Sequence, residues 1–313
     1  MFRRRSKFMI GLALVIVIMS SQLSAQSNGK NYTLAEANAF FEAKDWNKAI
    51  SAYQSLLKQD AKNGRAWLYL GLTYHMQQNY EPAIKAFEEA DRLQYARWQA
   101  RYNIACGHAL MNNKEAAFHW LDKALEVGFS QMELLESDSD LANLRADDRF
   151  QHVLQVADKN ARPCEYSGKH REFDFWIGEW DVFNQQGRQV GTNVIQKALN
   201  GCMLYENWSA PGQVGKSFSY FDSALGKWKQ NWVQAQGGII RYEGEFRDGA
   251  MRFTGESVLF DGSKELARGT FTPLADGRIH QFLEQSADDG KTWYVTFDGI
   301  YVKKNANGSG LNK

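Results

Sequence analysis

The residues best suited to a binding site are polar groups spaced two positions from tryptophans. In MLYENW, Glu206 lies two residues before Trp208, and in KWKQNWVQ, Gln230 lies between Trp228 and Trp232. Alternate residues of a β-strand point to the same face of a sheet. If both faces point inward, Glu206 and Gln230 become isolated polar groups in an aromatic lining, which is typical of a small-molecule site.

Three further residues extend this candidate site: Tyr220 in FSYFDS, and His280 and Glu284 on one face of IHQFLEQ. Burial raises the pKa of a carboxyl group, so Glu206 and Glu284 could act as acid and base in an enzyme. The competing interpretation is that Glu and Gln face solvent while the tryptophans form a core. The sequence contains no H-E-x-x-H, G-x-S-x-G or paired C-x-x-C motif, and we expect no metal and no cofactor. A lone histidine such as His280 is more often hydrogen-bonded than a haem ligand.

Two longer motifs also carry possible chemistry. SADDGKTW (286–293) matches the Asp-box pattern S-x-D-x-G-x-T-W of sialidases, and APGQVGKS (210–217) matches a relaxed phosphate-loop pattern. The Asp-box occurs once here, between two strand-like runs, and is expected to be a hairpin turn. A phosphate loop must lead from a strand into a helix, whereas APGQVGKS lies between two strand-like runs. We therefore expect both to be turns and do not expect ATP as a ligand.

The first 25 residues have the pattern of an export signal. Basic residues precede an 11-residue apolar run, and small residues end at Ala25. Spanning a bilayer takes about 20 residues, so we expect cleavage and a periplasmic or secreted protein; an uncleaved N-terminal anchor is the alternative. Without this segment the formal net charge changes from +1 to −3, because four basic residues are lost. No basic block remains, so nucleic acid is not an expected partner.

The three cysteines fall into two groups. Cys106 lies in a helical pattern and is expected to be a small buried packing residue. Cys164 and Cys202 lie in one predicted domain, 38 residues apart. In an oxidising compartment, a disulfide between them is our hypothesis.

The first half has an internal period of 34 residues. Ala49, Ala83 and Ala117 lie one period apart, and small and large residues recur in the same register. Over about 30–130 the chain resembles the tetratricopeptide family. The resemblance implies helical hairpins whose surface contacts a protein or peptide. The run 135–150 predicts a final helix that caps the apolar end, which gives an all-α domain over 30–155.

From about residue 165 the hydrophobic period changes from 3.6 to 2, which is typical of strands. Asp-Gly pairs between alternating apolar residues predict tight hairpins; they lie at 248–249, 261–262, 276–277 and 289–290. Strands joined this way, with no helix to cover an edge, favour closure. We expect an all-β antiparallel up-and-down barrel of about 8–10 strands over 163–305, followed by a flexible tail over 306–313.

Several stretches of the second half resemble a bacterial family of uncharacterised lipocalin-like, or calycin-like, barrels. They are FDFWIGEWDV (173–182), GCMLYENW (201–208), FSYFDSALGKWKQNWV (218–233) and the run over 276–301. The resemblance implies that Gly178 and Trp180 form a structural step at the barrel floor, with the Trp180 ring as a plug. Lys303 or Lys304 would then cover that ring. The resemblance implies a fold more than an activity.

Together these observations predict an exported two-domain binding protein. We expect the repeats to contact an unidentified protein or peptide and the barrel to hold a small, mostly apolar ligand. One alternative is an enzyme that acts on such a ligand through Glu206 and Glu284. The other is an interaction protein whose barrel is packed solid.

Overall fold

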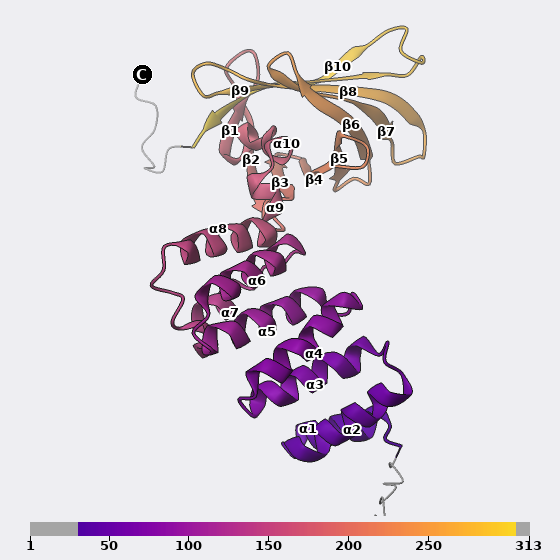
Figure 1. The fold of residues 1–313 in the computed structure, drawn as a ribbon. Helices are drawn as coiled ribbons and strands as arrows, with labels where there is room; N and C mark the ends of the chain where they lie inside the picture. The colour runs from indigo at the N-terminus through magenta and orange to yellow at the C-terminus, as the bar shows by residue number, and fades with distance from the viewer. Residues whose placement is uncertain (1–30, 305–313) are drawn as a thin grey trace, which may run out of the picture.

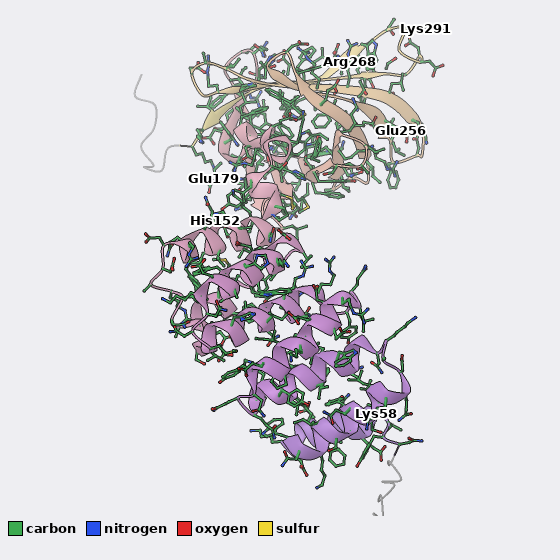
Figure 2. All side chains as sticks on the ribbon, in the orientation of Figure 1. Lys58, His152, Glu179, Glu256, Arg268 and Lys291 are labelled. Carbon is green, nitrogen blue, oxygen red and sulfur yellow. A yellow bond between two sulfur atoms is a disulfide. The ribbon has the colours of Figure 1, made fainter. Side chains whose placement is uncertain are left out.

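The computed structural model describes residues 31–304, which form a helical part followed by a β-barrel (Figure 1). The predicted signal peptide (1–25) and C-terminal tail (306–313) lie outside the described residues. Within residues 31–304, no helix has both the length and the apolar character needed to cross a membrane. Figure 2 shows the side chains on both parts.

The helical part begins with consecutive antiparallel hairpins, in which α1 packs on α2, α3 on α4 and α5 on α6. Shorter helices then lead into the barrel. The bounds are α1 Leu34–Glu42, α2 Trp46–Gln59, α3 Gly64–Met76, α4 Tyr80–Arg92, α5 Arg97–Leu110, α6 Lys114–Glu126, α7 Met132–Ser137, the 3₁₀ turn η1 Ser139–Leu141, α8 Arg149–Ala161, α9 Pro163–Tyr166, α10 Gly168–Arg171 and the 3₁₀ turn η2 Asp174–Trp176.

The 34-residue period recurs in the turn within each hairpin. Lys44, Gln78 and Asn112 lie one period apart, and each has a positive φ, of 56°, 61° and 59°. The next residue, Asp or Asn in every case, is the N-cap of the following helix. Short polar side chains are favoured there because they satisfy free backbone N–H groups. The repeated sequence therefore produces a repeated turn.

The small residues of the period lie where the helices cross. Ala49, Ala83 and Ala117 have no exposed surface. At Gly71, an added Cβ would lie 2.5 Å from the ring of Phe87 on the next helix. Larger side chains would push these helices apart, so the predicted helical repeats are confirmed by their packing.

The end of the array is closed by α7, η1 and α8, and not by a helix across 135–150. Asp138 ends α7 and accepts a hydrogen bond from the backbone N–H of Asp140 (3.0 Å). Ser and Asp side chains compete with the helix for backbone groups, and 135–150 is rich in both. The predicted helix was therefore placed too early. It is α8, which ends at Ala161, beyond the domain end predicted at 155.

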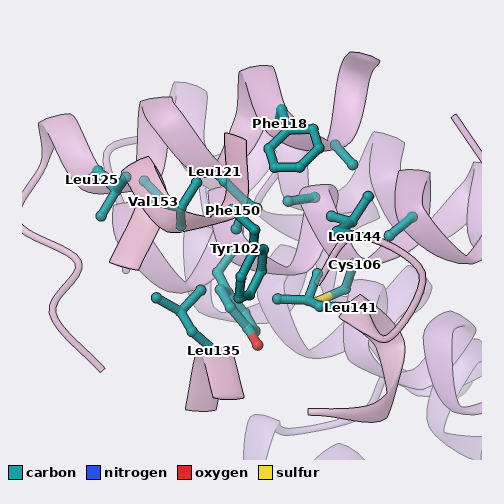
Figure 3. Packing of buried hydrophobic residues seen from close by; sticks show 14 of the residues in the cluster. Tyr102, Cys106, Phe118, Leu121, Leu125, Leu135, Leu141, Leu144, Phe150 and Val153 are labelled. Atoms are coloured by element: carbon teal, nitrogen blue, oxygen red, sulfur yellow. The ribbon is translucent and has the colours of Figure 1, made fainter. Parts of the chain in front are cut away.

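This segment nevertheless covers the apolar end of the array. Leu135, Leu141 and Phe150 are buried against Tyr102 of α5, as Figure 3 shows. The hydroxyl of Tyr102 donates to Asp138 (2.7 Å). Apolar packing and this hydrogen bond hold the closing segment on the last hairpin.

The C-terminal part is a closed barrel of antiparallel strands. Each strand pairs with the next along the chain, and β1 pairs with β10 to complete the circle. The predicted fold class is therefore confirmed. The bounds are β1 Gly178–Phe183, β2 Gln189–Ala198, β3 Met203–Ala210, β4 Gln213–Asp222, β5 Lys227–Gln234, β6 Ile239–Arg247, β7 Ala250–Val258, β8 Lys264–Pro273, β9 Ile279–Ser286 and β10 Tyr294–Lys303.

Two-residue turns make two of the strand connections. Asp248 and Gly249 join β6 to β7, and both have positive φ, as a type I′ hairpin turn requires. Pro211 and Gly212 form another two-residue connection, from β3 to β4, with Ala210 paired to Gln213. APGQVGKS thus runs from strand to strand, as predicted, and no helix follows it to face a phosphate.

SADDGKTW forms the turn between β9 and β10. One oxygen of Asp288 accepts hydrogen bonds from the backbone N–H of Thr292 and the hydroxyl of Ser286, both at 2.8 Å. The other accepts from the Thr292 hydroxyl (2.6 Å). These bonds lower the pKa of Asp288 to about 2. Trp293 donates to the carbonyl of Gly290 (3.1 Å). The motif is a self-capped turn, which confirms the prediction.

One end of the barrel is filled by the segment that enters it. Phe173, Trp176 and Trp180 are buried, with the rings of Phe173 and Trp176 stacked at 4.9 Å. Trp180 Nε1 donates to the carbonyl of Trp176 (3.0 Å). Lys303 Nζ lies 5.8 Å from the centre of the Trp180 ring. These residues fill this end of the barrel and form its floor.

The floor end is also the end that joins the helices. Cys164 of α9 forms a disulfide with Cys202, just before β3, with 5.0 Å between their Cα atoms. Lys197 of β2 lies 2.8 Å from Glu165 and 3.1 Å from Asp174. A covalent bond and an ion-pair cluster therefore fix the short helices to the barrel.

Candidate ligand site in the barrel lumen

The barrel contains a cavity of about 120 Å³ at the end opposite the floor. Its lining comes from β3 to β6 on one side and from β9 and β10 on the other. Gln213, Gln234 and Gln285 lie near the strand ends, at its outer edge. The lining residues are Glu206, Trp208, Gln213, Gln230, Trp232, Gln234, Ile240, Tyr242, Gln281, Leu283, Gln285, Thr296, Phe297 and Tyr301. The barrel is thus filled at the floor and hollow toward its mouth.

Glu206 of β3 lies at the centre of a polar network. Its side chain is 4% exposed. One carboxylate oxygen accepts from Asn193 Nδ2 of β2 (2.6 Å), and the other accepts from the hydroxyl of Ser217 on β4. Gln230 Nε2 of β5 donates to the same Ser217 oxygen (3.3 Å). Four neighbouring strands therefore hold the carboxyl group in one orientation.

The network continues across the barrel to strands far away in the sequence. Asn193 Nδ2 lies 3.2 Å from the hydroxyl of Tyr301 on β10, and that hydroxyl donates to Gln281 of β9. Burial raises the pKa of Tyr301 and of Tyr242 above the usual range of a phenol. Both tyrosines consequently stay neutral and can act as hydrogen-bond donors.

Burial also raises the pKa of Glu206, to about 7, although hydrogen bonds from Ser217 and Asn193 act in the opposite direction. Among the described residues that line the cavity, Glu206 is the one acidic group and there is no Lys, Arg or His. The carboxylate form therefore has no positive side chain beside it, and ionisation is disfavoured.

Glycines make room for the tryptophan walls. At Gly191, an added Cβ would lie 2.6 Å from the ring of Trp208; at Gly215, it would lie 2.2 Å from the ring of Trp232. Each ring thus lies close to the backbone of a neighbouring strand, where only glycine leaves room for it. Trp208 also meets Phe297 edge to face, with ring centres 5.7 Å apart. The result is an aromatic wall that leaves the centre of the lumen open.

Four of the predicted residues line the cavity: Glu206, Trp208, Gln230 and Trp232. Trp228 also points inward but lies deeper, where it packs against Phe173 of the floor (5.7 Å between ring centres). The sequence therefore predicted correctly which face of β3 and of β5 points into the barrel.

Tyr220, His280 and Glu284 do not lie in the lumen, and their assignment is corrected. Tyr220 stacks on the exposed Phe218 (6.3 Å), because the inner face of β4 carries Ser217 and Ser219 instead.

On β9, the inner face carries Gln281, Leu283 and Gln285, so residues between them point outward. His280 pairs with Asp298 (2.7 Å). Glu284 forms two hydrogen bonds with Arg268 (2.6 and 2.8 Å). Arg268 lies on the barrel wall in Figure 2 and also covers the ring of Trp293 at 4.1 Å.

The lumen residues that the sequence did not reveal come mostly from β6, β9 and β10. Tyr242, Gln281 and Tyr301 are buried and line the cavity. The Asp-Gly pair at 248–249 supplied a usable signal. A two-residue turn fixes the register of its two strands, so the phase of β7 gives that of β6. No such rule identifies which residues of strands far apart in the sequence lie at the same depth in the barrel.

The helical part contains a second concave surface. A groove of about 510 Å³ lies between α2, α3 and α4, and it includes the aromatic residues Trp67 and Tyr74. Lys58 and Lys85 lie on its border, and Lys58 is at the end of the array far from the barrel (Figure 2). The described lining contains no acidic residue: it is Gln54, Leu57, Lys58, Trp67, Leu70, Tyr74, Pro82, Lys85 and Ala86.

One cluster in the helical part has ligand atoms suited to a metal. Cys106, Asp138 and Asp140 bring a thiol and two carboxylates within 4.8 Å of one another. However, the oxygens of Asp138 already accept from the Tyr102 hydroxyl and the Asp140 backbone. Burial raises the pKa of the Cys106 thiol well above its usual value, which keeps it protonated. The cluster is explained by the closing segment of the array, and we assign no metal to it.

Comparison with known proteins gives a family match in the helical part. The tetratricopeptide repeat family model matches residues 34–96. Superkiller protein 3 of Schizosaccharomyces pombe is 32% identical over 126 residues, which is 36% of this chain and 9% of that protein. A chloroplastic protein of Arabidopsis thaliana is 29% identical over 93 residues, which is 29% of this chain and 28% of that protein. The chain thus spans less than a third of either curated relative.

Solved structures similar to part of this chain include the Yersinia enterocolitica type III secretion translocator chaperone SycD, with 19% identity and a TM-score of 0.29. That match covers 39% of this chain and 86% of SycD. MamA gives 16% identity and a TM-score of 0.36 over 43% of this chain and 79% of that chain. YrrB, a tetratricopeptide protein with an unusual peptide-binding site, gives 18% identity and a TM-score of 0.33. That match covers 45% of this chain and 69% of YrrB. Residues 34–96 match the tetratricopeptide repeat model, and the helical part that contains them is followed by a ten-stranded antiparallel barrel. Tetratricopeptide repeats suggest binding of proteins or peptides.

Proposed function

We propose that this is an exported binding protein with two sites, one for a protein or peptide on the repeats and one for a small ligand in the barrel. The cavity around Glu206 carries the proposal. It opens at the mouth of the barrel and is lined by aromatic and polar side chains together, among them the fixed carboxyl group of Glu206. Apolar walls with precisely placed polar groups are typical of a small-molecule site. A barrel that served only for interaction would be expected to fill its lumen, as this one does at the floor.

Export is supported by two features of the chain. The N-terminal 25 residues have the pattern of a cleaved signal. Cys164 and Cys202 are placed to form a disulfide, and disulfides persist in oxidising compartments. The position of Trp180 at the floor supports a relation of the barrel to lipocalin-like proteins, which also bind ligands in the lumen.

Native mass spectrometry of the gently purified full chain tests the lumen site. A bound small molecule is expected, and it should be lost in Leu283→Trp, because the larger ring would occupy the cavity. Val295→Trp is the matched control: Val295 lies at the same end of the barrel but is 53% exposed on its outer side. A ligand that still binds to Leu283→Trp would contradict the proposal. So would a wild-type protein that shows no bound small molecule in any preparation.

A photo-cross-linking residue at position 58 or 85 tests the site on the repeats. We expect adducts with one recurring partner at both positions, because Lys58 and Lys85 border the same groove. The same residue at position 291, at the far end of the barrel (Figure 2), is the control. Equal adducts at all three positions would show that the groove does not select a partner.

A further inference from the structure

The described lining of the cavity in the barrel can carry negative charge but not positive charge. Among the described residues, the lining of the cavity offers one carboxyl group, that of Glu206, and no basic side chain. When Glu206 ionises, its carboxylate is stabilised only by neutral donors, from Asn193 and Ser217. A buried charge is costly unless an opposite charge pairs with it. The cavity therefore disfavours anionic ligands and would be stabilised by a cation.

The walls suit a cation of a particular kind. Trp208, Trp232, Tyr242 and Phe297 line the cavity from four different strands. The face of an aromatic ring attracts an ammonium group at up to about 6 Å, and desolvation strengthens this attraction. Inorganic divalent cations instead take six or more oxygen ligands at short range. The described lining offers one carboxylate among its amide and hydroxyl oxygens, and both oxygens of that carboxylate already accept hydrogen bonds from Asn193 and Ser217.

The size of the cavity also restricts the ligand. Its volume of about 120 Å³ is slightly smaller than the roughly 150 Å³ of a cavity that accommodates benzene. A methylated ammonium head group has fewer heavy atoms than benzene and fits, whereas a sugar ring with its hydroxyl groups is too large to be enclosed. The amides of Gln213, Gln234 and Gln285 lie at the mouth, where they can bind a polar tail.

From these observations we propose that the lumen binds a small organic ammonium ion, with its positive group between the aromatic walls and beside Glu206. This inference rests on the proposed lumen site and specifies its ligand class. The other titratable groups that face Glu206 are Tyr242 and Tyr301. Both stay neutral, so the charge of the site depends on Glu206.

The test compares choline with its neutral isostere 3,3-dimethylbutan-1-ol, in which carbon replaces the charged nitrogen. Binding of both probes to the purified full chain is measured by ligand-observed NMR titration at pH 8 and pH 5.5. At pH 8 we expect choline to bind at least about tenfold more tightly, since an ion pair and cation–π contacts favour it. At pH 5.5 this preference should shrink, because Glu206 becomes protonated.

Matched variants identify the group responsible. Glu206→Gln should remove the preference for choline over the alcohol, because it removes the only carboxyl group among the described residues that line the cavity. Glu284→Gln, which removes a carboxylate from the outer wall, should leave both affinities as they are. Trp232→Leu keeps the charge but removes part of the aromatic wall, and it should weaken choline more than the alcohol.

The outcomes separate this inference from the proposed function. If choline and the alcohol bind equally well, and both are lost in Leu283→Trp, the lumen site stands and the ammonium inference is overturned. If choline does not bind but a neutral molecule co-purifies in the lumen, the ammonium inference is again overturned. If neither probe binds and the native protein is empty, both proposals fail.

Discussion

The most direct consequence of the lumen chemistry is a pH-dependent stability that Glu206 controls. The pKa of Glu206 is about 7 in the folded protein, against a usual value of 4.5. Because the folded value is the higher one, the protonated form favours folding. This contribution is complete below about pH 4.5 and is lost as the pH rises through 7. With about 1.4 kcal/mol for each pH unit, ionisation of Glu206 lowers the free energy of unfolding by about 3 kcal/mol.

Glu206→Gln removes this titration and keeps the size of the side chain. Urea unfolding of the wild type and the variant, followed by tryptophan fluorescence between pH 4.5 and 8.5, measures the difference. The gap between the two proteins should change by about 3 kcal/mol in favour of the variant as the pH rises. Glu284→Gln is the control: Arg268 lowers the pKa of Glu284, so its titration affects stability only below the usual value. Parallel curves for wild type and Glu206→Gln over this range would refute the reasoning.

Three further predictions concern the scaffold of the site. Replacing Cys164 and Cys202 by serine should lower the free energy of unfolding by about 4 kcal/mol, since the disulfide closes a 38-residue loop. A reductant should lower the stability of the wild type to the same value. A wild type whose stability does not change on reduction would count against this account. Gly191→Ala should cost about 1–3 kcal/mol in thermal unfolding, because the new Cβ would lie 2.8 Å from the carbonyl oxygen of Ser209, whereas Gly168→Ala has open space and should be neutral. Asp288→Ala should accelerate hydrogen exchange at the amide of Thr292, and an unchanged rate would show that the turn does not depend on its carboxylate.

The helical repeats and the barrel were predictable from sequence because each depends on a periodic pattern. The 34-residue period reappears as repeated positive-φ residues at Lys44, Gln78 and Asn112. The closing segment was less predictable, since Asp138 can either continue a helix or cap the next turn. The structure shows the second outcome.

The residues that face the lumen could be predicted on strands whose two faces differ in character as the sequence suggests. They could not be predicted on strands where the inner face carries small polar residues. On β3 the inner face alternates Leu204, Glu206 and Trp208 with exposed or half-buried residues. On β4, the aromatic Phe218 and Tyr220 lie outside while serines lie inside, which is opposite to the usual rule. The reason is volume: small inner residues on β4 leave space that the large ring of Trp232 occupies. Such compensation between neighbouring strands has no signature within either strand alone.

The junction holds the floor end of the barrel against the helices, and this bears on how the two proposed sites work together. Cys202 is bonded to α9, and Asn200 Nδ2 in the same turn lies 3.4 Å from the carbonyl of Ala161 at the end of α8. The floor is filled by aromatic side chains, so a ligand must enter through the opposite end, near Gln213 and Gln285. A partner bound to the repeats therefore leaves the mouth of the barrel open. This geometry allows both sites to be occupied at once, as a protein that brings a small ligand to a partner would require.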